Sequence, residues 1–339
     1  MSFGTPERAP TGGGGTPTAR GATSTGRGGT STSRGGSTTG AAWARLRRLA
    51  AIQAGWLRPP LPPGPGVCAV CRGPARADYL RCFHCGLHAQ SAPGLLADAI
   101  VPVSYAIKGD KHAHALWLYK SARTGAVPAQ AALASLLLVF LRDHCSCAWR
   151  MAGGGAPTHL AVVPSTRGRP GPHPLHALTA PLLTRPWAEL ALPVRSYPPD
   201  PDDRDLGLDR FILPSRLPGA RVLLLDDTWT TGSRAQSAAA ALKLAGATRV
   251  VVVVLGRHLN MGDDGMERIG QLLRDHRYRV GAGRMWPCPA RGSRVRTCFA
   301  PLTSHQCTVD QPGTFGPNML VAAHEILDRN VCGGSEKEG

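Results

Sequence analysis

Two adjacent carboxylates, Asp226 and Asp227, follow the apolar run 222–225 and precede a turn rich in hydroxyl groups, residues 228–233. The apolar run shows no polar alternation, which is typical of a parallel strand covered on both faces. A helix is predicted over 235–245, and the N–H groups at a helix N-terminus favour an anion. A sugar phosphate needs acceptors for its hydroxyl protons and donors for its phosphate. The segment supplies both, so we expect it to bind a ribose 5-phosphate.

The pattern hydrophobic-Asp-Asp-Thr-x-Thr-Thr-Gly-Ser resembles the phosphoribosyl-pyrophosphate (PRPP) motif of type I phosphoribosyltransferases. It differs from the glycine fingerprint of dinucleotide folds and from the lysine-containing P-loop. The resemblance implies that Asp226 and Asp227 are catalytic. It also implies that ribose and phosphate are bound by Asp226, Asp227, Thr228, Thr230, Thr231, Gly232 and Ser233. The alternative is a strand, an acidic turn and a capped helix without a ligand. Trp229 is expected to shield the site, to stack on an acceptor ring, or to pack beneath the turn.

Four of the ten cysteines form two Cys-x-x-Cys pairs separated by ten residues: Cys68, Cys71, Cys82 and Cys85. This spacing suits one tetrahedral Zn²⁺ held by four thiolates. The metal would supply folding free energy that so short a segment lacks. We therefore predict a structural zinc site, because four protein ligands leave no open position for catalysis. Two alternatives are disulfides, which a cytosolic chain disfavours, and His84 as a substitute ligand.

Strand-like and helix-like segments alternate between residues 100 and 255. Strands are predicted over 100–106, 159–164, 222–225 and 250–255, and helices over 129–144, 175–183 and 235–245. The alternation implies βαβ crossovers and a mainly parallel, twisted sheet, with the ligand crevice at the carboxyl ends of the strands. The expected fold class is α/β, and the PRPP motif implies a sheet of the type I phosphoribosyltransferase kind.

A loop of Gly, Pro and Arg residues follows the strand predicted over 159–164. Its short residues permit close approach of the backbone to a ligand, and two arginines can neutralise a pyrophosphate. We interpret this loop as the pyrophosphate-binding segment, formed by Ser165, Thr166, Arg167, Gly168 and Arg169. The alternative is an ordinary surface turn, since many turns have this composition.

The net charge of +17 is concentrated in part at the N-terminus, where residues 1–58 hold eight Arg and one Glu. Because the first forty residues are mostly Gly, Ser and Thr, they cannot bury enough apolar surface to offset chain entropy. A disordered basic tail is predicted over 1–58, either simply solvated or attracted nonspecifically to nucleic acid. Apolar residues at near-helical spacing over 43–57 also fit a helix that packs on its own domain or binds a surface.

The N-terminus lacks the apolar core of a signal peptide. The longest apolar stretch, 129–141, is shorter than the roughly 20 residues needed to span a bilayer. We therefore expect a cytoplasmic protein without membrane insertion, in which this stretch is a buried helix.

A four-Cys module followed by a PRPP motif resembles the ComF family of competence-associated bacterial proteins, over roughly 67–257. The resemblance implies a Mg²⁺-dependent transfer of phosphoribosyl from PRPP to a nitrogen acceptor, with release of pyrophosphate and a link to DNA uptake. Lys108-Gly109 and Tyr119-Lys120 resemble early elements of such proteins. Where the family has Arg-Gly-Phe-Asn-Gln, this chain has Arg-Gly-Arg-Pro-Gly-Pro-His-Pro-Leu, residues 167–175.

The resulting organisation has four parts: the tail 1–58, a zinc module 66–90, a phosphoribosyltransferase domain 98–260, and an extension 261–339 with a helix over 317–329. The expected ligand is PRPP, and the resemblance adds DNA or competence proteins as partners. The alternative function is a noncatalytic PRPP-binding or nucleic-acid-associated accessory protein. The motifs specify neither the acceptor nor the oligomeric state.

Overall fold

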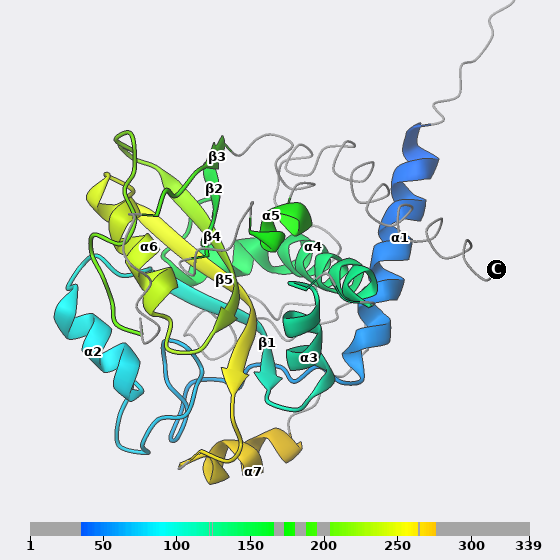
Figure 1. Cartoon of the computed structure of the whole chain (residues 1–339), viewed down its shortest axis with the longest axis horizontal. Helices are drawn as coiled ribbons and strands as arrows, with labels where there is room; N and C mark the ends of the chain where they lie inside the picture. Colours follow the sequence, from blue (N-terminus) through cyan, green and yellow to red (C-terminus); the bar gives the residue numbers. More distant parts are fainter. Residues whose placement is uncertain are drawn as a thin grey trace, which may run out of the picture.

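The computed structural model describes residues 35–165 without 122 and 124, 173–179, 188–194, and 204–275 without 264. Its centre is a five-stranded sheet in the order β1-β5-β4-β2-β3, with every pairing parallel (Figure 1). The strands are β1 Ala99–Ile107, β2 His159–Val162, β3 Ala188–Leu190, β4 Arg221–Trp229 and β5 Arg249–Leu259. The predicted α/β class with a parallel sheet is therefore confirmed.

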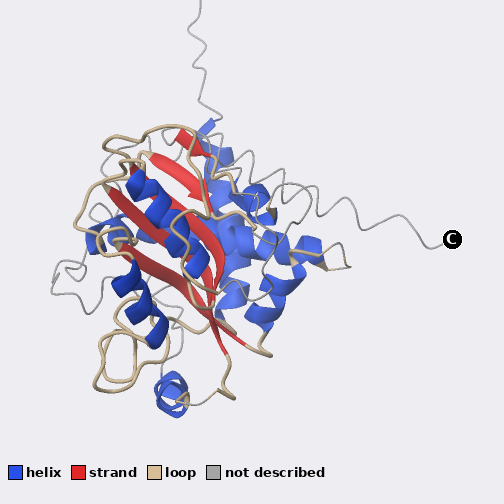
Figure 2. Cartoon of the chain, turned by 60° about the vertical axis from the view of Figure 1, so that its left-hand side comes forward, coloured by secondary structure: helices blue, strands red, loops and turns tan. Residues whose placement is uncertain are grey.

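Helices cover both faces of this sheet (Figure 2). One face carries α1 Gly35–Ala54, α3 Lys111–Leu118, α4 Ala126–Met151 and α5 Pro174–Thr179. The other carries α6 Ser233–Leu244 and the four-Cys segment, which includes the start of α2 Phe83–Ser91. A last helix, α7 Glu267–Asp275, packs against the ends of β1 and β5 through a smaller apolar cluster. The chain thus forms three layers.

The central strands are buried on both faces, as their unbroken apolar runs predict. On β4, Leu223 and Leu225 contact the layer of α1 and α4, whereas Val222 and Leu224 contact the layer of α6. The valines of β5 alternate between the same two layers, and all five are at most 1% exposed. Because successive side chains point to opposite faces, a central strand needs apolar residues at every position.

The connections define where a ligand crevice should lie. From β2 the chain moves through α5 to β3 at one edge, whereas from β4 it moves through α6 to β5 in the opposite direction. The neighbouring carboxyl ends of β2 and β4 are therefore at a point where the strand order reverses. In open parallel sheets, ligands bind at this point.

The tail predicted over 1–58 was wrong for its second half, because residues 35–54 form α1. Trp43, Leu46 and Ala50 are in the core against α4, and the Arg142 guanidinium lies 4.1 Å from the centre of the Trp43 ring. The helix packed on its own domain is the alternative that holds. In residues 43–54 the spacing of the apolar side chains was a better guide to structure than the composition, which suggested disorder. Residues 1–34 lie outside the described ranges.

Helix α4 is long and apolar enough to cross a membrane by length and composition. In this fold, however, 72% of its most apolar window is buried inside the protein, as expected of a core helix. The prediction of a buried helix over 129–141 is confirmed. Helices α2, α3 and α7 were not predicted, and the helix expected over 317–329 lies outside the described residues.

Candidate functional site

The carboxylate of Asp227 is the most heavily engaged group at the end of β4. Its Oδ2 atom accepts a hydrogen bond from the Tyr119 hydroxyl at 2.5 Å and lies 2.6 Å from Lys120 Nζ and 3.4 Å from His173 Nε2. The side chain is 3% exposed. Burial alone would raise the pKa of Asp227, but Lys120 and the Tyr119 hydrogen bond lower it below its usual value. Asp227 is therefore an anion held among donors.

Asp226 has the opposite electrostatic character. Burial raises the pKa of Asp226 to about 7, and the neighbouring Asp227 charge adds to the rise, while Arg234 and Lys120 oppose it. Asp226 Oδ1 accepts a hydrogen bond from the backbone N–H of Asp227 at 2.9 Å. The two adjacent carboxyls therefore separate into one firmly ionised group and one that gains a proton near neutrality, an arrangement typical of functional sites.

The raised pKa of Asp226 makes stability depend on pH. In the unfolded chain Asp226 has a pKa of about 3.9, so between this pH and about 7 the folded chain keeps a proton on Asp226 that the unfolded chain has lost. Proton binding by the folded state stabilises it at low pH, and this stabilisation is lost as pH rises toward 7. Asp226→Asn removes that contribution while keeping an acceptor for the Asp227 N–H. We expect the free energy of unfolding of the variant, measured relative to that of wild type, to increase by roughly 3 kcal/mol between pH 4 and pH 8. Urea unfolding at both pH values measures it; a pH-independent difference contradicts the assignment.

The hydroxyl-rich turn after β4 leads directly into α6. Gly232 precedes the helix with φ of 84°, and the backbone N–H of Ser233 donates to Thr231 Oγ1 at 3.4 Å. The Thr231 and Ser233 hydroxyl oxygens lie 3.2 Å apart. Polar hydroxyls and the N-terminus of a twelve-residue helix thus come together beside the carboxylates. This arrangement can bind an anion.

Trp229 lies beneath this turn and not in contact with solvent, since it is 1% exposed. A Cβ atom built on Gly232 would overlap the Trp229 indole ring. The packing alternative for Trp229 is therefore confirmed, and at 1% exposure the ring has no free face on which an acceptor could stack. The glycine is required twice, by its left-handed φ and by its contact with the ring.

Gly232→Ala should destabilise the fold and distort the turn. A left-handed alanine costs about 1–2 kcal/mol, and displacing a buried indole adds to that. Gly219→Ala is the matched control, because Gly219 also has a positive φ, 73°, but open space around its Cβ position. Denaturant unfolding should show a larger loss for Gly232→Ala, by about 1 kcal/mol or more. Equal losses would mean that the indole contact has no energetic role.

The loop interpreted as pyrophosphate-binding begins where predicted, at the end of β2. Ser165 is half-buried there, next to the strand β4 that carries the carboxylates. Thr166, Arg167, Gly168 and Arg169 lie outside the described residues. The chain is described again at His173, whose ring reaches Asp227. The loop therefore starts and ends beside the carboxylate pair.

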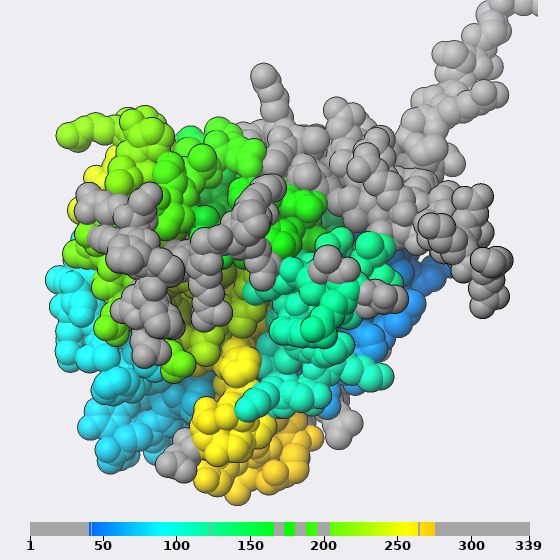
Figure 3. Space-filling model, viewed as in Figure 1, coloured from blue at the N-terminus to red at the C-terminus, as the bar shows by residue number. Residues whose placement is uncertain are grey.

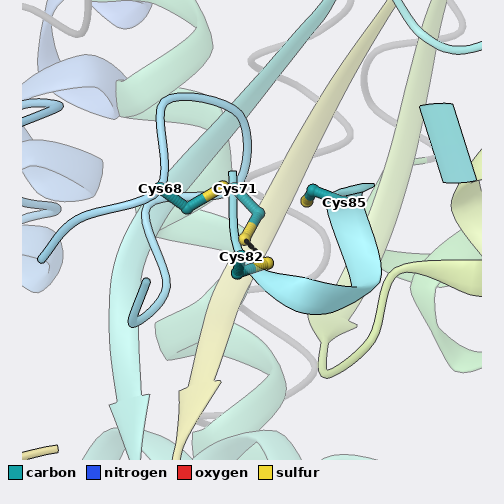
Figure 4. A group of neighbouring side chains, drawn as sticks. All are labelled: Cys68, Cys71, Cys82 and Cys85. Carbon is teal, nitrogen blue, oxygen red and sulfur yellow. Dashed lines mark hydrogen bonds between the residues drawn. The ribbon is translucent and has the colours of Figure 1, made fainter. Parts of the chain in front are cut away.

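The four predicted cysteines form a single cluster. Their sulfur atoms all lie within 4.8 Å of one another, and Cys71 Sγ and Cys82 Sγ are 3.6 Å apart (Figure 4). A tetrahedral zinc with Zn–S bonds of about 2.3 Å separates its sulfurs by roughly 3.8 Å. All four cysteines are free thiols, so the disulfide alternative is wrong, and His84 is not part of the cluster. The cluster is close enough to bind a metal ion.

The local fold explains this convergence. Cys68 and Cys71 lie in a tight turn in which Val70 N and Gly73 N donate to their sulfurs at 3.4 Å. Cys85 projects from the first turn of α2. Hydrogen bonds among the four cysteines lower the pKa of Cys68 and raise the pKa values of Cys82 and Cys85, so one negative charge in the cluster makes a second one harder to form without a cation. Four thiolates at this spacing require a bound metal ion to balance them.

Arg257 connects the cysteine cluster to the turn after β4. Arg257 is 6% exposed, and its guanidinium lies against Gly73, two residues after Cys71. Its Nη1 atom donates to the carbonyl of Trp229 at 3.1 Å and to that of His258 at 2.6 Å. Tyr105 on β1 ties the same segment to the sheet, because its hydroxyl donates to the Arg72 carbonyl at 2.6 Å. The metal module and the candidate ligand site therefore share buried contacts.

Sequence reasoning found the carboxylates, the turn and the cysteines, but assigned no role to His173 or Arg257. Tyr119 and Lys120 were noticed as a short Tyr-Lys element, but nothing in the sequence indicated that their side chains contact Asp227. His173 and Arg257 had no signal of this kind, because the residues that tie them to the site, Asp227 for His173 and Trp229 for Arg257, are 28 or more residues away along the chain. Comparison with known proteins adds no family: no family model, curated protein or solved structure matches this chain.

Proposed function

We propose that this protein binds PRPP with Mg²⁺ and transfers its phosphoribosyl group to a nitrogen acceptor, as a type I phosphoribosyltransferase does. The observation that carries the proposal is the position of Asp226 and Asp227. They lie near the carboxyl end of β4, at the reversal of strand order, shortly before the hydroxyl turn and the N-terminus of α6. A sugar and its 5-phosphate need this combination of acceptors and donors within one residue cluster.

In the proposed reaction the acceptor nitrogen attacks C1 of PRPP. The C1–O bond to pyrophosphate breaks, pyrophosphate leaves with both electrons, a C1–N bond forms, and the acceptor N–H proton passes to solvent. Positive charge develops on the ribose, and the anionic Asp227 beside it stabilises that charge. Asp226, once ionised, accepts from a ribose hydroxyl, while Thr230, Thr231 and Ser233 hold the 5-phosphate.

Ser165 and the loop that follows it would hold the pyrophosphate, beside the end of β2. Mg²⁺ would be held mainly by oxygens of PRPP, and it would supply positive charge to the departing pyrophosphate. The four-Cys cluster would hold a structural Zn²⁺, since its four thiol ligands leave no position for a substrate. The metal would fix the module that contacts Arg257.

Thermal unfolding tests the proposal. PRPP should raise the melting temperature in the presence of Mg²⁺, because a ligand that binds only the folded state stabilises it by mass action. Ribose 5-phosphate, which lacks the pyrophosphate, should raise it less. No shift by PRPP at millimolar concentration, in a protein that is folded and zinc-loaded, would reject the proposal.

A second candidate is a noncatalytic accessory role, in which the protein binds PRPP and docks on a partner. The four-Cys module favours it, because Tyr79, Leu80 and Phe83 are 57%, 82% and 74% exposed. Several large apolar side chains exposed together are typical of interaction surfaces. PRPP binding without pyrophosphate release, over a broad panel of acceptors, would favour this candidate over the transferase.

A further inference from the structure

Arg257 on β5 is a buried cation whose hydrogen bonds go to neutral carbonyls. It is 6% exposed, and none of the described carboxylates forms an ion pair with it. Its Nε atom is buried and has no hydrogen-bond partner among the described residues. Burying a charge is costly unless an opposite charge lies nearby. The position of Arg257 therefore requires an anion close to it.

The four-Cys cluster supplies this negative charge. The Arg257 guanidinium lies against Gly73, and the Gly73 N–H donates to the Cys71 sulfur at 3.4 Å. Hydrogen bonding to Cys68 raises the pKa of Cys71, and the charge of Arg257 is among the influences that lower it. Zn²⁺ neutralises only two of four thiolates, so the metal-bound cluster keeps a net negative charge. Arg257 is placed to balance part of it.

A second buried arginine adjoins the same cluster. Arg72 follows Cys71 directly and is 8% exposed, and its Nη1 atom is buried without a hydrogen-bond partner among the described residues. Burial lowers the pKa of Arg72, and nearby acidic groups, among them the Cys68 and Cys71 thiols, oppose the fall. Two buried cations thus accompany a cluster that retains negative charge when zinc is bound, which favours charge balance as their shared role.

The Arg257 guanidinium also holds the turn after β4. Its Nη2 atom faces Gly73, whereas its Nη1 atom donates to the Trp229 carbonyl at 3.1 Å. Trp229 is the last residue of β4 and directly precedes Thr230, and Gly232 of the turn lies against its ring. One side chain therefore contacts both the metal module and the residue from which the hydroxyl-rich turn begins.

The packing around this side chain is continuous. Cys68 and Cys71 share one apolar cluster with Trp229 and with the β5 valines Val250, Val252 and Val254. In Figure 3 the light-blue surface of the four-Cys segment adjoins the yellow surface at the end of β5. Close-packed interiors transmit a displacement instead of absorbing it. A shift of the guanidinium at the cluster should therefore reach the turn.

We propose that Arg257 is a positioning residue that couples the four-Cys cluster to the turn after β4. The metal-bound cluster holds the guanidinium by its charge, and the guanidinium holds the Trp229 carbonyl. The cluster then acts beyond its own module, because its occupancy sets the geometry of residues 230–233. Coupling free energies are reciprocal, so a ligand on the turn should tighten zinc binding in return. The effect on PRPP rests on the proposed transferase function, whereas the coupling itself needs only zinc.

Gly73→Ala tests the coupling without removing a charge or a metal ligand. The three atoms nearest to a Cβ on Gly73 all belong to the Arg257 guanidinium and would overlap it, so the guanidinium must move. Gly86→Ala is the matched control, because Gly86 follows Cys85, nothing lies within 4 Å of its Cβ position, and neither glycine has a positive φ.

The measurement is amide hydrogen exchange of residues 228–233 in the zinc-loaded full chain. Exchange should be at least about fivefold faster in Gly73→Ala than in wild type, and unchanged in Gly86→Ala. Far-UV circular dichroism shows that each variant is folded. Equal exchange in the two variants would overturn the proposal.

Zinc affinity, measured by competition with a chelator, tests the role of the charge. Arg257→Gln should weaken zinc binding by about 10–100-fold although it removes no ligand, as is typical of residues that support metal ligands. Arg257→Lys keeps the charge and should recover most of that affinity. Arg76→Gln should change nothing, because Arg76 is on the same module but lies 5.4 Å from the centre of the Tyr79 ring. Equal losses in Arg257→Lys and Arg257→Gln would reject Arg257 as the counter-charge.

PRPP provides the reciprocal readout. With PRPP and Mg²⁺, wild type should bind zinc at least about fivefold more tightly, and Gly73→Ala should lose most of this gain while Gly86→Ala keeps it. A protein that bound no PRPP would overturn the transferase function, and hydrogen exchange and zinc affinity would still decide the coupling. If PRPP bound but tightened zinc equally in both variants, the coupling would be overturned while the PRPP site stood.

Discussion

Replacing Cys85 with Ser is expected to release the metal and to unfold the four-Cys module. Structural zinc contributes on the order of 10 kcal/mol or more to the folding of small metal-binding peptides. Cys85 is 3% exposed, and its sulfur lies within 4.8 Å of the other three. A serine cannot replace a thiolate ligand, and the three remaining cysteines would hold zinc weakly.

The loss should extend beyond the module. Cys68, Cys71 and Cys85 belong to the apolar cluster that covers one face of β4 and β5, so unfolding of the module exposes that face. Arg257 would also lose its contact with Gly73, and with it part of the support for the Trp229 carbonyl. We therefore expect a large fall in melting temperature together with weaker PRPP binding.

Cys145→Ala is the control for this experiment. Cys145 is also a buried free thiol, but it lies on α4 outside the cluster. It should retain one zinc per chain by mass spectrometry and lose only the few kcal/mol typical of a small core truncation. If Cys85→Ser retained zinc, or if its melting temperature matched that of Cys145→Ala, the cluster would not be a structural metal site.

Asp227→Asn is expected to lower phosphoribosyl transfer by at least about 100-fold. Removing one electrostatic stabiliser of a transition state commonly has an effect of this size. The substitution keeps the shape of the side chain and removes the charge that faces Lys120 at 2.6 Å and the developing charge of the ribose. The readout is pyrophosphate release from PRPP in the presence of an acceptor.

Loss of an ion pair can also lower turnover by destabilising the fold. A second ion pair, away from the site, therefore serves as the control. Asp143 pairs with Arg47 between α4 and α1 at 3.0 Å, away from the carboxylate site. Asp143→Asn should leave turnover unchanged while causing at most a small loss of stability, because Arg47 is exposed. Turnover of Asp227→Asn at the wild-type rate would exclude Asp227 from the reaction.

Local patterns predicted the parts of the fold that local physics determines. The valine run 250–254 and the run 222–225 became central strands because only a doubly covered strand is apolar at every position. The Cys-x-x-Cys spacing predicted the cluster, because the geometry of a knuckle is set within four residues. The same patterns underestimated β4, which continues through both carboxylates to Trp229.

Long-range packing determined what the patterns did not predict. Trp43 and Leu46 pack helix α1 against α4, and the Arg47–Asp143 pair that joins the two helices spans 96 residues of chain. The composition of the residues next to α1 in the sequence was therefore a poor guide to its structure. The contacts of Asp227 with Tyr119 and His173 join three separate segments. They depend on the strand order, which the sequence alone leaves open.

The most direct test of the central claim is a calorimetric titration of PRPP into the zinc-loaded full chain, with and without Mg²⁺. We predict saturable binding at one site per chain, stronger with Mg²⁺ and abolished when Asp226→Asn and Asp227→Asn are combined. A folded, zinc-loaded protein that showed no heat of binding with PRPP and Mg²⁺ would contradict the account.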